Sequence, residues 1–128
     1  MDNEIPPPDC LNTSEFMWHV TMHTPQVLRQ VNGIVSVDAH VRIDAAGHVT
    51  VKSVTCRTMN GRAIAPDNAE VVAAARAALV LLRFAPARDA DGNAVPFEDY
   101  SLSFGYTTAA LEMRASDADR IRCQSSKN

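Results

Sequence analysis

An alanine- and valine-rich segment from residue 67 to residue 82 places the strongest constraint on the fold of this chain. Asp67 can accept a hydrogen bond from the first turn while Glu70 reaches back to it, a capping box with Asp in place of Ser or Thr, and Pro66 stops any helix arriving from upstream. At about 100° per residue, roughly a third of the circumference is apolar and carries Val71, Val72, Ala75, Ala78, Leu79 and Leu82. The pattern predicts an amphipathic helix that packs one face on a core.

The surface under this helix is predicted upstream, where residues 35–43 alternate between apolar and polar side chains. One face of this strand is expected to be buried, and the other carries Ser36, Asp38, His40 and Arg42. Residues 44–47 form a turn and residues 49–51 resume the alternation, which predicts a β-hairpin. Past residue 52 the apolar parity shifts, so a bulge or a strand end is expected there.

A last strand is predicted from Val95 to Tyr106, with a bulge at Glu98 and Asp99, where the apolar parity changes. Strand, strand, helix and strand in this order form a hairpin followed by a crossover, which places the third strand beside the first. The expected fold class is α+β: a three-stranded antiparallel sheet with helices packed on one face. The polar face of the sheet is left to solvent or to a partner.

The chain length predicts a single domain in three parts: an irregular arm (1–14), the folded domain (15–108), and a helical extension with a tail (109–128). A short helix is predicted with Thr24 as its cap and Pro25 as its first residue, ending at Asn32. Residues 57–66 form a turn-rich connection. Aromatic residues make up only 5% of the chain, so Trp18, the single Trp, is expected to fill core space.

These segments, taken in order, resemble the C-terminal domain of TonB, the energy transducer of Gram-negative envelopes. The resemblance covers residues 24–106 and is carried by Gly33 to Val37, Ile43 to Val49, the helix ending in Arg83 to Ala87, Asp91 to Pro96, and the strand closing on Phe104. Leu82 stands where the family usually has Trp, and the segment before Gly33 is shorter than the usual helix. The resemblance implies the sheet-and-helix fold described above and a location in the periplasm.

In the TonB family, the C-terminal domain grips a short segment of outer-membrane receptors by adding it to the edge of its sheet. The resemblance implies the same function here: transport-linked energy coupling through protein binding, without an enzyme activity. The alternative is a scaffolding or dimerisation module of the cell envelope that does not couple to receptors. The usual members of the family have an inner-membrane anchor and a long Pro-rich spacer, so this chain is either a stand-alone relative or the part that follows an anchor or a signal peptide. Pro6 to Pro8 resemble the end of such a spacer, which favours the second.

The final strand is the predicted binding site, because a last strand beside the first has a neighbour on one side only. The residues expected to bind the partner are Tyr100, Ser101, Leu102, Ser103, Phe104, Gly105 and Tyr106. The larger side chains anchor one face of the strand, and the small ones leave the other face slim enough for an incoming segment. A helical run from Ala109 could fold back and cover this edge in the free protein.

Charge and hydropathy argue against other partners. The chain has a net charge of −3 and no run of Lys or Arg, which disfavours a surface for nucleic acid or anionic membranes. No window approaches the roughly 18 consecutive apolar residues of a transmembrane helix. The start, from Met1 to Pro8, lacks the apolar centre of a signal peptide.

The three cysteines, Cys10, Cys56 and Cys123, lack the Cys-x-x-Cys spacing of zinc and redox sites. In a periplasmic protein two of them are expected to form a disulfide, and all three pairings remain open. The alternative is a cytosolic protein with three reduced thiols.

No motif predicts catalysis, a metal site or a cofactor. His19 and His23 are four residues apart but lack a third ligand, so ordinary surface histidines are expected. Residues 89–93 are similar to the start of a calcium loop, but the glycine comes too early, which favours a turn. Asp38 and His40 share one strand face, yet no Ser or Cys is placed by a motif as a nucleophile, which favours a solvated polar surface.

Overall fold

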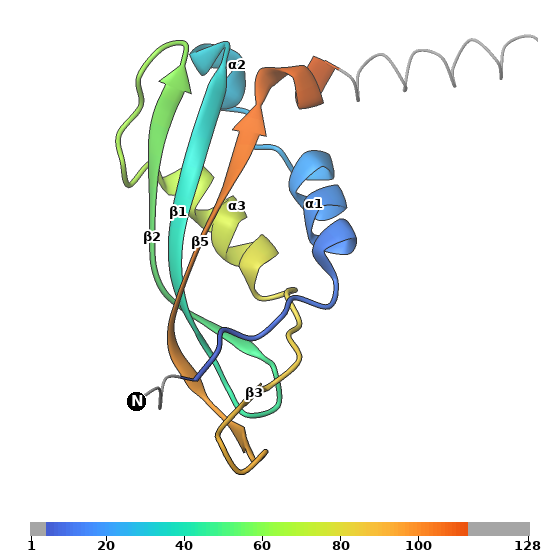
Figure 1. The fold of residues 1–128 in the computed structure, drawn as a ribbon. Coiled ribbons are helices and arrows are strands. Elements are labelled where there is room, and N and C mark those ends of the chain that lie inside the picture. Colours follow the sequence, from blue (N-terminus) through green and yellow to red (C-terminus); the bar gives the residue numbers. More distant parts are fainter. Residues whose placement is uncertain (1–4, 113–128) are drawn as a thin grey trace, which may run out of the picture.

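The computed structural model describes residues 5–112, which form a three-stranded antiparallel sheet with helices packed against one face (Figure 1). Along the chain the elements are α1 (Thr13–Met22), α2 (Leu28–Val31), β1 (Ile34–Ile43), β2 (Val49–Asn60), α3 (Ala69–Leu79), β3 (Ala87–Arg88), β4 (Ala94–Val95) and β5 (Phe97–Thr107). Residues 108–112 are also helical. The strand order is β2-β1-β5, and β3 pairs with β4 in a separate ribbon. The predicted α+β class and the place of the last strand beside the first are confirmed.

The central strand, β1, owes its position to its alternating sequence. Its inward side chains are at most 1% exposed and comprise Val35, Val37, Ala39, Val41 and Ile43. Its even-numbered side chains remain partly or fully exposed on the opposite face. The alternation therefore separates a buried face, covered by the helices, from an open polar face, as predicted.

The sheet has three register shifts, one of them between Ile34 and Val35 and the other two at the positions where the apolar parity changes. In β2 the extra residue is Lys52, which falls between the residues paired with His40 and Val41. In β5, Glu98 and Asp99 together occupy the place opposite the single residue Arg42. Both predicted irregularities are confirmed as bulges.

β2 is longer than the sequence pattern indicates. It extends to Asn60, so the first part of the connection predicted for residues 57–66 is strand. The ladder continues because Thr58 still pairs with Val35. The turn follows at Gly61, where φ is +106°, a conformation that glycine adopts without strain.

α3 packs its predicted stripe on the core. Val71, Ala75, Ala78 and Leu79 are 0% exposed, and Leu82, just past the helix, is 3% exposed. Val72, at the margin of the stripe, is only partly buried. The buried stripe is confirmed, but the helix is shorter than the predicted 67–82, since it ends at Leu79 and leaves Leu82 outside it.

The start of α3 differs from the predicted capping box. The N-cap is Asn68, not Asp67, and its side-chain oxygen accepts a hydrogen bond of 3.1 Å from the backbone N–H of Val71. The Asn68 N–H is itself held by a turn from the Ala65 carbonyl, which carries the chain past Asp67 before the helix begins. Glu70 does not reach back to the cap. Its carboxylate accepts instead from the N–H of Val27, at 3.0 Å, and so joins α3 to the start of α2.

The prediction that Trp18 fills core space was wrong, because this side chain is 65% exposed. Phe16 and Val20 are the buried residues of α1. Trp18 lies two positions from each of them, about 200° away around the helix, so its side chain points away from the core. The core beneath α1 is filled by Phe16 itself, whose ring contacts that of Phe104 edge to face at 5.0 Å.

Thr24 closes α1 and does not cap the next helix as predicted. It is buried, and its hydroxyl donates to the carbonyl oxygens of Val20 (3.2 Å) and Thr21 (2.8 Å). The next helix, α2, begins at Leu28 and ends as predicted at Asn32, which has a left-handed φ of 50°. Among the described residues, no helix is long and apolar enough to span a membrane.

The N-terminal arm is held against the segment that follows α3. The Ala85 N–H donates to the Asp9 carbonyl at 2.9 Å, and the Leu11 N–H donates to the Arg83 carbonyl at 2.8 Å. α1 then begins at Thr13, inside the range predicted as irregular. The arm is therefore part of the folded unit from residue 9 onward.

Candidate functional site

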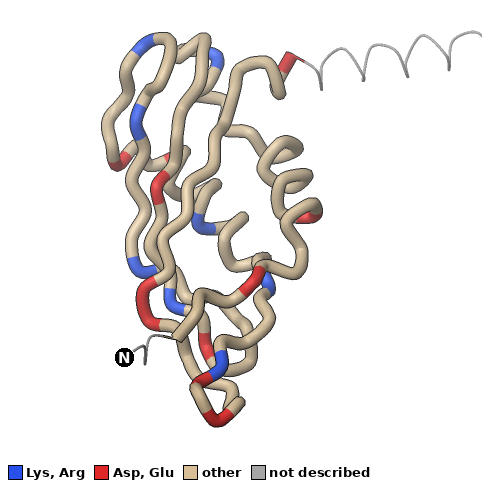
Figure 2. Tube along the Cα trace, in the orientation of Figure 1, with Lys and Arg blue, Asp and Glu red and all other residues tan. Residues whose placement is uncertain are grey.

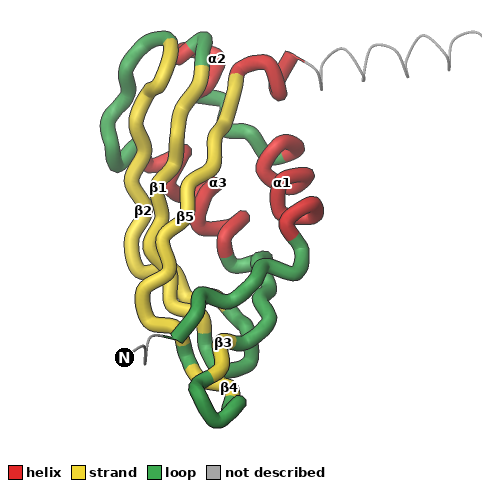
Figure 3. Tube along the Cα trace, in the orientation of Figure 1, coloured by secondary structure: helices red, strands yellow, loops and turns green. Residues whose placement is uncertain are grey.

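β5 is an edge strand of the sheet. It pairs with β1 along one side, and no described strand pairs with its other side. Figure 3 shows it as the outer strand of the sheet, on the side where α1 lies. The predicted site residues 100–106 all belong to this strand.

The direction of the free backbone groups follows from the register. The Thr108 N–H donates to the carbonyl of Gly33, the residue just before β1, at 3.0 Å, and pairing with β1 continues without interruption from there back to residue 100. Because residues of an antiparallel strand alternate in direction, the even-numbered residues of β5 bond to β1. Ser101, Ser103 and Gly105 therefore point their N–H and C=O groups to the open side. No described residue accepts from these N–H groups.

The side chains of β5 divide between two surfaces as predicted. Phe104 and Tyr106 are buried beneath the helices, and Tyr100 and Leu102 are partly buried on the same face. Between residues 100 and 106, the opposite face carries Ser101, Ser103 and Gly105, all exposed. Burial raises the pKa of Tyr106 to about 12.

The other edge of the sheet, along β2, is partly occupied by the chain itself. The outward N–H of Cys56 donates to the Pro66 carbonyl at 2.8 Å. Farther along, the Thr58 hydroxyl accepts from the Ile64 N–H at 3.2 Å. The connection after β2 thus lies beside this strand, and β5 is the more open of the two edges.

A small apolar hollow of about 160 Å³ lies next to the open edge, between α1 and β5. Phe16 and Met17 of α1 form one wall, and Leu102 and Phe104 of β5 form the other. Phe84 also lines the hollow, with its ring 5.0 Å from that of Tyr100. The half-buried Cys10 also borders the hollow.

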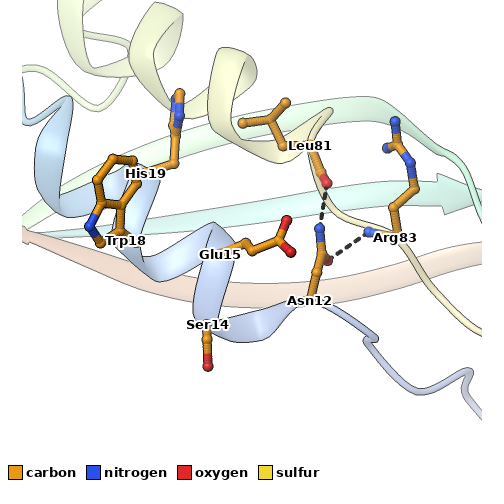
Figure 4. A pocket seen from close by; sticks show the side chains of 7 residues that line it. All are labelled: Asn12, Ser14, Glu15, Trp18, His19, Leu81 and Arg83. Carbon is orange, nitrogen blue, oxygen red and sulfur yellow. Dashed lines mark hydrogen bonds between the residues drawn. The ribbon is translucent and has the colours of Figure 1, made fainter.

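A larger open hollow, of about 690 Å³, lies between α1 and the segment that follows α3 (Figure 4). The Asn12 side chain connects the two sides of this hollow. Its amide donates to the Leu81 carbonyl at 2.8 Å and accepts from the Arg83 N–H at 2.9 Å. Trp18 and His19 lie at the opposite end in Figure 4. Arg83 is engaged locally, because its guanidinium donates to two carbonyl oxygens at the end of α3. The lining combines the apolar Trp18 and Leu81 with polar side chains, and its Ser14, Glu15 and His19 are not hydrogen-bonded to one another.

The open sheet face contains a Ser, His and Asp in contact, but not in a catalytic relay. The Nδ1 atom of His40 lies 3.3 Å from the Asp99 carboxylate and 3.0 Å from the Ser101 hydroxyl. A serine-nucleophile relay needs the two partners on different ring nitrogens, whereas both share one here. Nearby, the carboxylate of Asp38 accepts from the Ser103 hydroxyl at 2.7 Å. This face is therefore a solvated, internally paired polar surface, as expected.

The histidine pair does not converge on a metal position. The rings of His19 and His23 stack with centroids 4.1 Å apart, and burial followed by the neighbouring His23 lowers the pKa of His19. Within residues 5–112, no three His, Cys, Asp or Glu side chains are grouped so as to hold a metal ion. The segment 89–93 is a turn as predicted, because the Asp89 carboxylate accepts from the backbone N–H groups of Asp91 and Asn93.

The expected disulfide is not found among the described residues. Cys10 and Cys56 are free thiols, and Cys123 lies outside the described residues. Burial raises the pKa of the Cys56 thiol, which donates a hydrogen bond to the Ala65 carbonyl at 3.3 Å.

Sequence reasoning placed the edge correctly but missed the two hollows. The sequence gives only a partial indication of the hollows: α1 has apolar residues outside its buried face, above all Met17 and Trp18. No family model, curated protein or solved structure matches the chain in the comparisons with known proteins.

Proposed function

We propose that this protein is a periplasmic binding domain that recognises an extended segment of an envelope or outer-membrane protein by adding it to the sheet as a strand beside β5. The observation that carries the proposal is the row of outward backbone groups at Ser101, Ser103 and Gly105, none of which has an acceptor for its N–H among the described residues. Such a row is a template for pairing with another chain.

The shape of the edge supports an incoming strand. On the open face the side chains beside the edge are two serines and a glycine, so a new strand meets no bulky group there. On the inner face the new strand would continue the layer of Tyr100, Leu102 and Phe104, next to an apolar hollow. Main-chain pairing then supplies affinity, and the hollow supplies contact with alternate side chains.

The compartment and the class of partner rest on the resemblance to the TonB family. In that setting the domain transmits force or a change of state from the inner side of the envelope to a receptor. Its role is binding and not catalysis.

A pair of proline substitutions tests strand addition. Ser103→Pro removes an N–H that points to the open side, so we expect the domain to stay folded, as measured by circular dichroism. The variant should no longer bind the peptides that the unmodified protein selects from a random seven-residue library. Leu102→Pro, one position away, removes an N–H that bonds to β1 and should unfold the sheet. Normal peptide binding by a folded Ser103→Pro variant would contradict strand addition at this edge.

A second candidate function, scaffolding through self-association, is favoured by a different observation. Large apolar side chains are exposed around α1 and the end of α3: Leu11 (67%), Trp18 (65%), Val80 (49%), Leu81 (41%) and Met17 (40%). Sedimentation of the protein and of Trp18→Ser tests it. A dimer that Trp18→Ser dissociates would support this role, and a monomer at millimolar concentration would remove it.

A further inference from the structure

We propose that the hollow between α1 and β5 is a side-chain pocket, and that it selects partner segments with one phenyl-sized apolar residue flanked by Lys or Arg. The inference rests on the proposed strand addition, since the pocket receives a side chain of the added strand. It goes beyond strand addition, because backbone pairing alone is nearly blind to sequence.

The geometry places one side chain of the added strand in the pocket. Side chains of a strand alternate between faces, so every second residue of the new strand would share the inner face with Leu102 and Phe104. The residue beside Leu102 meets the opening between β5 and Met17 of α1. The other set of side chains lies beside Ser101 and Ser103 and faces solvent.

The size and lining of the pocket favour an aromatic ring or a large aliphatic group. Its volume of about 160 Å³ is close to the roughly 150 Å³ that accommodates a benzene molecule in a protein interior. Its walls include Phe16, Phe84 and Phe104, whose ring edges and faces can pack against another ring. A charged side chain would lose its hydration there, and no Lys, Arg, Asp or Glu lines the pocket to pair with it.

The charge around the pocket favours basic flanking residues. α1, β5 and residues 108–112 contain no Lys or Arg and carry the carboxylates of Glu15, Glu98, Asp99 and Glu112. Figure 2 shows this separation, with red but no blue along α1 and β5, whereas β2 carries the basic residues Lys52 and Arg57. Glu98 is paired with Arg42, but no described Lys or Arg forms an ion pair with Glu15 or Asp99. A Lys at either end of a bound segment would thus approach a carboxylate that has no Lys or Arg partner, and the contact of Asp99 is with the His40 ring at 3.3 Å.

The test uses blocked synthetic peptides of sequence Lys-Thr-Ser-X-Ser-Thr-Lys, titrated calorimetrically into the full-length protein. The sequence reads the same in both directions, so the result does not depend on strand polarity. With X as Phe, binding should be at least about tenfold tighter than with X as Ala, since a phenyl ring is buried. Glu in place of both Lys residues should weaken binding about threefold at low salt, and added salt should reduce that difference.

Variants on α1 show whether the preference comes from this pocket. Met17→Trp, which fills the hollow, should reduce the Phe-to-Ala affinity ratio to near one. Ser14→Trp is the matched control on the same helix, because Ser14 borders the larger hollow of Figure 4, and it should keep the ratio. A ratio that is near one in the unmodified protein, or that Met17→Trp leaves unchanged, overturns the pocket.

The outcomes separate this inference from strand addition. If Ser103→Pro loses all peptides while the unmodified protein binds Phe and Ala peptides equally, the edge is correct and the pocket is wrong. If the Phe preference survives in Ser103→Pro, the pocket binds without strand addition. The chain's own Arg120, Ile121 and Arg122, outside the described residues, have the same basic and apolar chemistry. Ile121→Asp should leave affinity unchanged, and a tenfold gain would overturn the assignment to an external partner.

Discussion

Replacing Leu79 with Ala tests the packing of α3 on the sheet, on which the whole architecture depends. Leu79 ends α3 and is 0% exposed, within the single cluster of buried residues. Its neighbours Ala75 and Ala78 are equally buried but too small to fill the space that a truncated side chain would leave. We therefore expect Leu79→Ala to reduce the free energy of unfolding by about 2 to 5 kcal/mol, as for other cavity-forming Leu→Ala changes.

Urea unfolding followed by far-ultraviolet circular dichroism measures this change. For a two-state domain of this size, a loss of that order lowers the urea midpoint by about 1 to 3 M. Leu81→Ala is the matched control, because Leu81 lies two positions away and is 41% exposed, and its effect should stay within about 0.5 kcal/mol. Equal and small effects of both substitutions would show that the buried stripe does not face the sheet and would refute the fold.

Three further predictions concern local features. Asn68→Ala should cost about 1 kcal/mol through loss of the α3 cap, whereas Asp67→Ala should cost much less, as measured by thermal unfolding. Because the pKa of Tyr106 is raised to about 12 in the folded protein, the unfolded chain loses this proton at a lower pH than the folded one. The contribution of Tyr106 to stability should therefore be full below about pH 10 and fall as the pH rises toward 12. Tyr106→Phe should flatten that part of the stability profile, and an unchanged slope would show that the Tyr106 hydroxyl is not the cause. Cys10 should react with a maleimide faster than Cys56, because Cys56 is buried and its thiol pKa is raised. Mass spectrometry of protein prepared from the periplasm, before and after reduction, tests whether two of the cysteines form a disulfide there.

Patterns with a fixed period could be read from the sequence. The alternation along residues 35–43 and the stripe of α3 follow from periods of 2 and 3.6 residues, and each breaks where the structure has a bulge or an end. The same alternation in β5 also predicted which side chains of the candidate site share a face. What remained undetermined was the direction of its backbone groups, which required the bond between Thr108 and Gly33.

The sequence could not predict features for which two adjacent residues are almost equally suitable. Asp67 and Asn68 can both cap a helix, and the turn from Ala65 decides between them. A single Trp is commonly buried, but on α1 the positions of Phe16 and Val20 turn Trp18 outward. The pairing of the arm with residues 83–85 and the hollow beside β5 arise from contacts between distant segments, which no local pattern carries.

The most direct test of the account is amide hydrogen exchange along β5, measured by NMR with and without the peptide that has Phe at X. In the free protein the outward N–H groups of Ser101, Ser103 and Gly105 should exchange fast, while those of Leu102 and Phe104, which bond to β1, should exchange slowly. Strand addition predicts that saturating peptide slows the three outward amides at least about tenfold and leaves the inward ones slow. Outward amides that exchange equally fast with peptide bound would contradict it.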